Sequence, residues 1–232
     1  MRLATLAALI VLVAGAPVSA GEVTMSTTAR LHWMGHDTFR IDGPPVVYVD
    51  PFQLPAGAPP ADLILITHEH SDHCSPADVK AIRTPKTVVV APRVAAASLE
   101  GPVEVIAPGE TKAFAGVTVR AVPAYNTDKR FHPRGAGMVG YLFTVGGASY
   151  YHAGDTDHIP EMAGLAPDVA LLPVSGTYVM TAEQAAAAAR AIAPKIAVPM
   201  HFGAIVGAAS DAERFAALLA GSGIEVVVPK KE

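Results

Sequence analysis

Three histidines and an aspartate crowd into six positions directly after an apolar run. Residues 63–74 have the sequence L-I-L-I-T-H-E-H-S-D-H-C, which contains His68, His70, Asp72 and His73. Because side chains two positions apart point to the same side of an extended chain, His68 and His70 are expected to lie together. A solvated polar loop is the alternative, but an unpaired charged cluster at the end of a buried strand is costly. Imidazole and carboxylate are ligands that zinc prefers, so this stretch predicts a metal site.

The elements that would position these groups are extended, β-branched segments that alternate with alanine-rich ones. Strands are predicted at 30–34, 38–41, 46–50, 63–67, 87–91, 103–106, 117–122, 139–145, 149–152, 169–173, 196–200 and 225–228, and helices at 76–83, 93–100, 181–193 and 211–220. Thr181 and Gln184 have the spacing of a capping box, and Asp211 is expected to begin a helix. The pattern favours a mixed sheet with helices outside it. A dinucleotide-binding sheet is not supported, because no G-x-G-x-x-G follows the first strand.

The composition is that of a folded chain without a nucleic-acid surface. The 232 residues are 51% hydrophobic and carry a net charge of −4, which excludes a disordered chain. No cluster of Lys and Arg forms a basic stripe, so a nucleic-acid partner is not expected. The G-x-S-x-G motif is absent, which disfavours an α/β-hydrolase with a serine nucleophile.

Residues 1–20 predict a secretory signal peptide. Arg2 precedes an apolar run at 3–16, and V-S-A at 18–20 places small residues before the expected cleavage point. An uncleaved membrane anchor is the alternative, but the run is shorter than the about 20 residues of a spanning helix. We therefore expect one mature domain at 21–232, periplasmic or secreted, with no stable membrane span. An internal disulfide is excluded, because the chain has one cysteine.

Three motifs occur along the chain in a characteristic order: H-x-H-x-D-H at 68–73, H-A-G-D-T at 152–156 and P-M-H-F at 199–202. With them the chain resembles the metallo-β-lactamase superfamily over nearly all of the expected mature domain. G-H-D-T-F-R-I at 35–41 and V-D-P-F at 49–52 make it look like the branch that contains ascorbate-phosphate lactonase. The N-acyl phospholipid phosphodiesterases have a similar core. The resemblance implies an α/β (α+β) fold, a four-layer αββα sandwich with one or two metal ions at its rim.

The resemblance also implies a set of metal ligands. They are His68 and His70 for the first ion, Asp72, His73 and His201 for the second, and Asp155 as a bridge between both. Asp50 would orient a ligand imidazole, a role that suits a carboxylate at a strand end. Gly154 would allow close backbone approach beside Asp155. The residues alone leave alternatives open, because Asp155 can be a turn aspartate and His201 a core histidine.

One histidine of the superfamily pattern is missing. After the predicted strand at 117–122 the sequence P-A-Y-N places Asn126 where an imidazole is expected, and an amide oxygen binds zinc more weakly. Three outcomes are open: a single ion at the second position, completion of the first by His132, or a structural Asn126 with His132 exposed. We expect His132 to lie near the metals as a ligand or substrate contact. His36 and His158 follow extended segments and could face either the site or solvent.

These features together predict an exported metal-dependent hydrolase. Bound zinc lowers the pKa of its water to about 7 and polarises the carbonyl or phosphoryl oxygen of the bond under attack. We expect the substrate to be a lactone, ester or phosphodiester, either a small molecule or a lipid-like one. Asp72 is a candidate proton acceptor, and Asn126 and His132 are candidates for stabilising oxyanion charge. The expected cofactor is one or two Zn²⁺ ions, with Mn²⁺ or Fe²⁺ as alternatives. A β-lactamase and a metal-binding module without catalysis are the competing functions.

Overall fold

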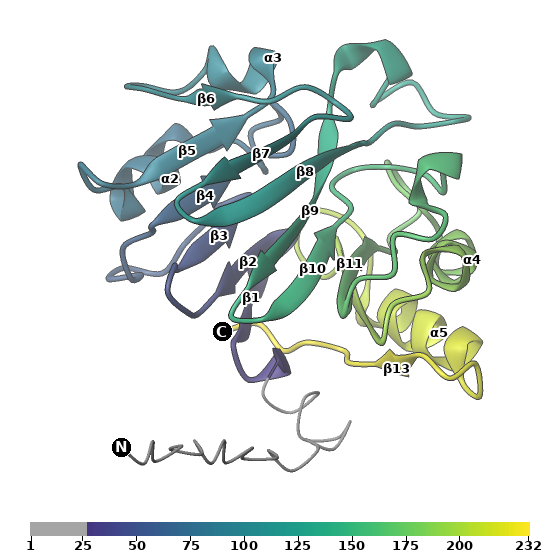
Figure 1. Ribbon diagram of the computed structural model, residues 1–232. Helices are drawn as coiled ribbons and strands as arrows, with labels where there is room; N and C mark the ends of the chain where they lie inside the picture. The colour runs from purple at the N-terminus through teal and green to yellow at the C-terminus, as the bar shows by residue number, and fades with distance from the viewer. Residues whose placement is uncertain (1–26) are drawn as a thin grey trace, which may run out of the picture.

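Two β-sheets face each other, and helices cover their outer faces (Figure 1). The computed structural model describes residues 27–232, so the predicted signal peptide at 1–20 lies outside the described residues. The first sheet has the order β1-β2-β3-β4-β5-β6, with β1 (Leu31–Gly35), β2 (Thr38–Ile41), β3 (Val47–Val49), β4 (Leu63–Leu65), β5 (Val88–Ala91) and β6 (Glu104–Val105). The α helices α2 (Pro76–Ile82) and α3 (Arg93–Ala96) belong to this half of the chain.

The second sheet is built from the later part of the chain. Its order is β13-β12-β11-β10-β9-β8-β7, with β7 (Thr111–Phe114), β8 (Val117–Pro123), β9 (Val139–Val145), β10 (Ala148–His152), β11 (Val169–Pro173), β12 (Ile196–Met200) and β13 (Glu225–Val226). The longer helices α4 (Ala182–Ile192) and α5 (Ala209–Leu219) flank it, with short 3₁₀ turns at Arg134–Ala136 and Pro160–Met162. The predicted αββα sandwich is thus confirmed. Within the described residues, no helix combines the length and apolar character needed to cross a bilayer.

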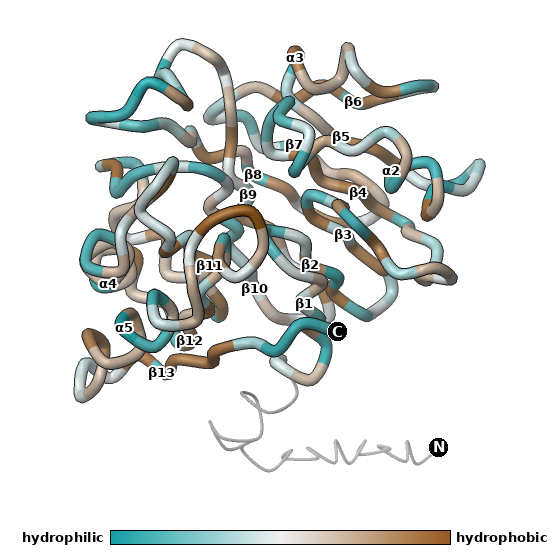
Figure 2. Tube along the Cα trace, turned by 180° about the vertical axis from the view of Figure 1, so that it is seen from behind, coloured by the Kyte–Doolittle hydropathy of each residue, from teal (hydrophilic) through white to brown (hydrophobic). Residues whose placement is uncertain are grey.

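A continuous apolar core lies between the sheets, and a smaller one lies under α2 and α3. Leu63 and Leu65 of β4 belong to the large core, whereas Ile64 belongs to the small one together with Val79 of α2. A strand that is buried on both faces is apolar at every position, which explains the uninterrupted run before His68. The strands carry much of the hydrophobic colour and the peripheral loops much of the hydrophilic colour (Figure 2).

The predicted elements agree with the structure except at a few places. β7 was not predicted, because of its four residues only Phe114 is buried and no alternating pattern marks it. The helix predicted at 93–100 ends earlier, at Ala96. The helix α5 begins at Ala209 rather than at Asp211, whose carboxylate accepts a hydrogen bond from Ala208 N at 2.8 Å.

The strands that precede the candidate ligands all point toward one rim of the sandwich. β3 and β4 are parallel in the first sheet, as are β10, β11 and β12 in the second. β1 runs in the same direction as β3, because both are antiparallel to β2. In the same way, β8 runs in the direction of β10, because both are antiparallel to β9. The two sheets meet at this rim, where His201 N donates to His36 O at 3.1 Å. Residues that follow different strands are therefore brought together.

Candidate metal centre

Three imidazoles form the first half of the site. His68 and His70 follow β4, and His132 lies in the loop between β8 and β9. His70 Nδ1 lies 3.1 Å from His68 Nε2 and 3.3 Å from His132 Nε2. One donor atom from each residue lies within 4.8 Å of the other two. The structure therefore places His132, which is 1% exposed, where the sequence motif lacks a histidine.

Asn126 holds this loop in place. Its Oδ1 accepts a hydrogen bond from His132 N at 3.0 Å, and its own N donates to His132 O at 2.7 Å. Its Nδ2 donates to Tyr178 O at 2.9 Å. Asn126 Oδ1 also lies 3.2 Å from His132 Nδ1, so a proton on Nδ1 leaves the Nε2 lone pair free to bind a cation.

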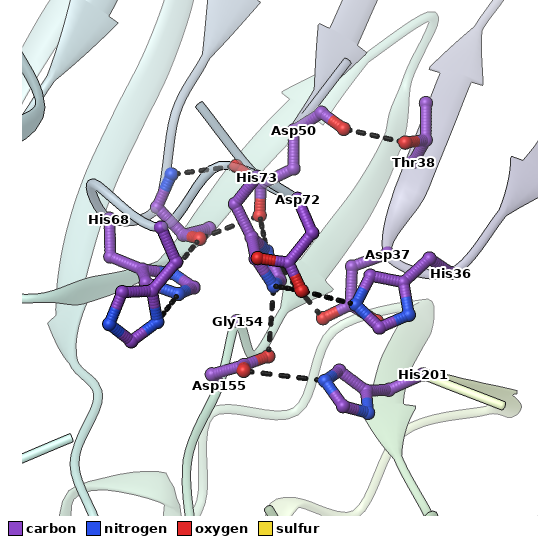
Figure 3. A network of polar contacts seen from close by, with 12 residues as sticks. His36, Asp37, Thr38, Asp50, His68, Asp72, His73, Gly154, Asp155 and His201 are labelled. Atoms are coloured by element: carbon purple, nitrogen blue, oxygen red, sulfur yellow. Dashed lines mark hydrogen bonds and ion pairs between the residues drawn. The ribbon is translucent and has the colours of Figure 1, made fainter. Parts of the chain in front are cut away.

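Asp155 links the first half of the site to a second half. Its Oδ2 lies 3.3 Å from His132 Nε2. The same oxygen lies 3.3 Å from His201 Nε2, and Oδ1 lies 3.4 Å from His73 Nε2 (Figure 3). Burial by itself raises the pKa of Asp155, but the charges of His201 and His73 outweigh it and hold that pKa well below its usual range. The carboxylate is thus ionised and faces imidazoles from both halves.

The residues of this centre fit a divalent cation. Within residues 27–232, neither His73 Nε2 nor Asp155 Oδ1 has a hydrogen-bond partner, although both atoms are buried. Buried polar atoms without partners are costly, and a cation between a carboxylate oxygen and an imidazole nitrogen satisfies both. Nitrogen and oxygen donors of this kind suit zinc, and the same set also accepts manganese or iron.

Further polar contacts fix the orientation of the imidazoles. His73 Nδ1 donates to Asp50 Oδ2 at 2.8 Å, and Thr67 N and Oγ1 donate to the same carboxylate at 2.7 and 2.6 Å. Ser175 Oγ lies 2.8 Å from His201 Nδ1. These contacts leave Nε2 of both imidazoles facing Asp155, as is usual for metal-ligating histidines. Asp50 and His201 have φ values of 45° and 60°, a backbone strain that clusters at functional sites.

Asp72 lies at the edge of the cluster and pairs with His36, for which the sequence allowed either the site or solvent. Its Oδ2 accepts a hydrogen bond from His36 Nε2 at 3.1 Å and lies 3.8 Å from His73 Nε2. Burial opposes ionisation of Asp72, but the hydrogen bond from His36 and the charge of His73 outweigh it and lower its pKa to about 2. His36 is 1% exposed, whereas His158 lies on the surface.

Asp37 is a further buried carboxylate, which the sequence analysis did not single out. It is 0% exposed, and neither of its oxygens has a hydrogen-bond partner within the described residues. One of its oxygens lies within 4.8 Å of donor atoms of His73, Asp155 and His201. Burial holds the pKa of Asp37 well above its usual range, against the opposing charge of His201. The sequence feature that could have indicated Asp37 is its position next to His36, after a strand that runs to the rim.

An open pocket of about 420 Å³ lies over the centre. It is lined by Phe52, His70, Ser71, Asp72, Phe131, His132, Asp155, Tyr178 and Ile205. Phe131 and Ile205 are 41% and 51% exposed, and the rings of Phe131 and Tyr178 pack edge to face at 4.7 Å. The pocket lining therefore combines polar groups of the site with exposed apolar side chains. A larger hollow of about 540 Å³ along α2 contains none of the clustered histidines.

One smaller expectation, for Gly154, is confirmed. A Cβ on Gly154 would lie 3.0 Å from Val139 O and 3.1 Å from Thr67 Cβ, so the backbone beside Asp155 does approach its neighbours closely. Cys74 is buried in the small core, and burial raises the pKa of its thiol to about 12. Such a thiol is inert, so Cys74 packs as a small hydrophobic residue.

Comparison with known proteins identifies relatives over most of the chain. A family model of the Beta-lactamase superfamily domain matches residues 30–201. A UPF0173 metal-dependent hydrolase of Thermoplasma acidophilum is 36% identical over 218 residues, which cover 88% of this chain and 96% of the relative. A UPF0173 metal-dependent hydrolase of Symbiobacterium thermophilum is 33% identical over 84% of this chain and 93% of the relative.

Solved structures share the fold. A candidate metal-dependent hydrolase from Parabacteroides distasonis superposes with a TM-score of 0.78 at 35% identity, covering 87% of this chain and 93% of the other. Igni18, described as a metallo hydrolase from Ignicoccus hospitalis, gives a TM-score of 0.70 at 26% identity, with 87% and 94% coverage. The match to the family model runs from just before β1 to His201 at the rim of the second sheet.

Proposed function

This chain belongs to the metallo-β-lactamase superfamily, and on that premise we propose that it is a metal-dependent hydrolase of uncharged esters or lactones. One observation supports the proposal most strongly. Buried imidazoles from both halves of the site contact the same carboxylate, Asp155, which lines an open pocket. The proposed ligands are His68, His70 and His132 for one ion, Asp72, His73 and His201 for the other, and Asp155 for both. Zinc is the proposed metal, because imidazole and carboxylate donors suit it.

The cations supply hydroxide near neutral pH and polarise the bond under attack when they are bound. The residues of the chain supply binding and orientation. Asp72 lines the pocket and is 24% exposed, and its low pKa keeps it ionised, so it can accept a hydrogen bond from the attacking water. We assign Asn126 to holding His132 rather than to contacting the substrate, because its amide is bonded to His132 and Tyr178.

The pocket walls support an uncharged substrate. No lysine or arginine lines the pocket within the described residues. Lys129 Nζ is bound to Asp157 at 2.6 Å and Arg134 to Glu161 at 3.1 Å. The guanidinium of Arg130 lies 5.8 Å from the centre of the Phe131 ring, outside the pocket lining. Phosphate recognition commonly uses such cations. Phe131 and Ile205 instead offer exposed apolar surface to an acyl or alkoxy group.

The test compares two chromogenic substrates with the same leaving group. Zinc-loaded protein should hydrolyse p-nitrophenyl butyrate with a kcat/KM at least about 10-fold above that for bis(p-nitrophenyl) phosphate, a difference worth about 1.4 kcal/mol in transition-state free energy. Chelation of the metal and the Asp155→Asn substitution should each abolish turnover. Asp128→Asn is the matched control, because Asp128 is an exposed loop residue that does not line the pocket.

Each alternative outcome of this test contradicts a different part of the proposal. Faster hydrolysis of the phosphodiester would leave a metal-dependent hydrolase but contradict the assignment of an uncharged substrate. Turnover of a cephalosporin in preference to both would favour a β-lactamase. Bound metal without turnover of any of the three would favour a binding module.

Export remains a prediction from the sequence. The signal at residues 1–20 predicts a periplasmic or secreted protein, and fractionation of expressing cells is the direct test. We expect the mature protein to begin near Gly21 and to accumulate outside the cytoplasm. N-terminal sequencing that finds Met1 on the cytoplasmic protein would contradict this.

A further inference from the structure

We propose that Asp37 is a direct ligand of the second cation, together with His73, Asp155 and His201. This inference rests on the metal centre of the proposed function and gives a ligand role to Asp37, which lies in G-H-D-T-F-R-I at 35–41 but is not among the ligands that the resemblance implies. On this inference Asp37 takes the place that the proposed function gives to Asp72. The second ion would then be held by the carboxylates of Asp37 and Asp155 and the imidazoles of His73 and His201, with Asp72 at the pocket edge.

The geometry brings Asp37 to this position. One oxygen of Asp37 lies within 4.8 Å of donor atoms from all three of the other residues. His201 Nε2 lies 3.3 Å from Asp155 Oδ2 and His73 Nε2 lies 3.4 Å from Asp155 Oδ1, spacings that suit two donors bound to one zinc ion at about 2.0–2.2 Å each. The four side chains point toward a common space, from both sheets (Figure 3). Asp72 contributes to no such set and instead bonds His36.

The turn that carries Asp37 is firmly held. His152 Nε2 donates to Asp37 O at 2.8 Å, and Thr38 Oγ1 donates to Asp50 O at 2.6 Å. Trp33 Nε1 donates to His36 O at 2.9 Å on the preceding residue. The surrounding structure therefore fixes the backbone at Asp37, while its carboxylate makes no hydrogen bond within the described residues.

Charge makes a cation the natural partner of this carboxylate. Asp37 is 0% exposed and Asp155 is 4% exposed, and their oxygens share one small space. Two ionised carboxylates in so small a space would repel each other and lose their hydration, so one of them keeps its proton unless a cation lies between them. His73 Nδ1 does not satisfy Asp37, because it lies 3.9 Å away and donates to Asp50 Oδ2. A divalent cation between the four donors satisfies both carboxylates at once.

The experiment is a zinc titration of metal-free protein against a chromophoric chelator. For Asp37→Asn we expect the second zinc ion to bind more than about 100-fold more weakly, which exceeds the 10–100-fold loss typical of a residue that only orients a ligand. The first ion should bind as in the wild type. Asp50→Asn is the matched control, since Asp50 is equally buried and touches His73 only at Nδ1, so its loss should stay within that range.

A second readout separates a ligand from a residue that merely supports the fold. Metal-free Asp37→Asn should melt at about the temperature of metal-free wild type, because Asp37 makes no hydrogen bond within the described residues that the amide would lose. A structural residue would lower that melting temperature. If the variant does not fold, crystals of the zinc-loaded wild type decide, with an Asp37 oxygen expected within about 2.2 Å of the ion.

Two results would overturn the inference. A loss of affinity no larger than that of Asp50→Asn, or a zinc-to-Asp37 distance beyond about 3 Å, removes Asp37 from the ligand set while leaving the metal centre intact. Failure of the wild-type protein to bind zinc, manganese or iron would overturn the proposed function and this inference together.

Discussion

At the scale of single residues, the proposed metal centre takes from His132 the imidazole that the motif lacks at Asn126. Asn126 stands where a histidine was expected, yet His132 reaches Asp155 Oδ2 at 3.3 Å. The residue types predicted the metal chemistry, because imidazoles and carboxylates in six positions have few other uses. The sequence could not settle His132 or Asp37, since a loop and a tight turn place them and neither has a periodic pattern. Their burial against Asp155 became visible only in the folded chain.

Substitution of His132 tests its assignment to the first ion. His132→Ala should reduce the bound zinc from about two ions to about one per chain, because the first position would retain only His68, His70 and the bridge. Asp155→Ala should remove both. The measurement is elemental analysis of protein purified without chelator.

A surface histidine provides the control for that substitution. His158→Ala should leave the metal content unchanged, because His158 is exposed. If His132→Ala also keeps its full metal content and its turnover, His132 is not a ligand.

At the scale of elements, the predicted strands and helices agree with the structure best where most residues of the element are buried. β9 and β11 have the predicted bounds, and both are largely buried. β7 was missed because it is an edge strand with mostly exposed residues. The capping box before α4 was predicted and is confirmed, with Gln184 N donating to Thr181 Oγ1 at 3.2 Å and Thr181 N to Gln184 Oε1 at 2.9 Å.

The capping box should contribute measurably to stability. Thr181→Ala removes a side-chain acceptor from the first turn of α4 and should lower the free energy of unfolding by about 1 kcal/mol. Thr177→Ala is the matched control on an exposed loop and should change it by less than about 0.5 kcal/mol. Urea unfolding followed by circular dichroism measures both. Equal effects of the two substitutions would contradict the role of the cap.

At the scale of the whole molecule, the proposed metal centre ties the two sheets together. His68 and His73 follow a strand of the first sheet, whereas Asp155 and His201 follow strands of the second. The sheets already share the large apolar core, and the cations add a polar link at the rim. Because the folded state alone brings these donors together, metal binding should stabilise the fold.

Removal of metal should therefore lower the melting temperature. At a free zinc concentration of 100 times Kd, each ion adds about 2.7 kcal/mol, which corresponds to roughly 5–10 °C in a domain of this size. Calorimetry with and without chelator measures the difference. The Asp155→Ala variant should show no such shift, and an equal shift in that variant would place the stabilising metal elsewhere.

The most direct test of the central claim is anomalous diffraction from zinc-loaded crystals at the zinc absorption edge. We predict two peaks at the rim, each within about 2.2 Å of an oxygen of Asp155, one beside His68 and His132 and the other beside His73 and His201. A map whose peaks lie away from Asp155, with these imidazoles directed elsewhere, would contradict the account.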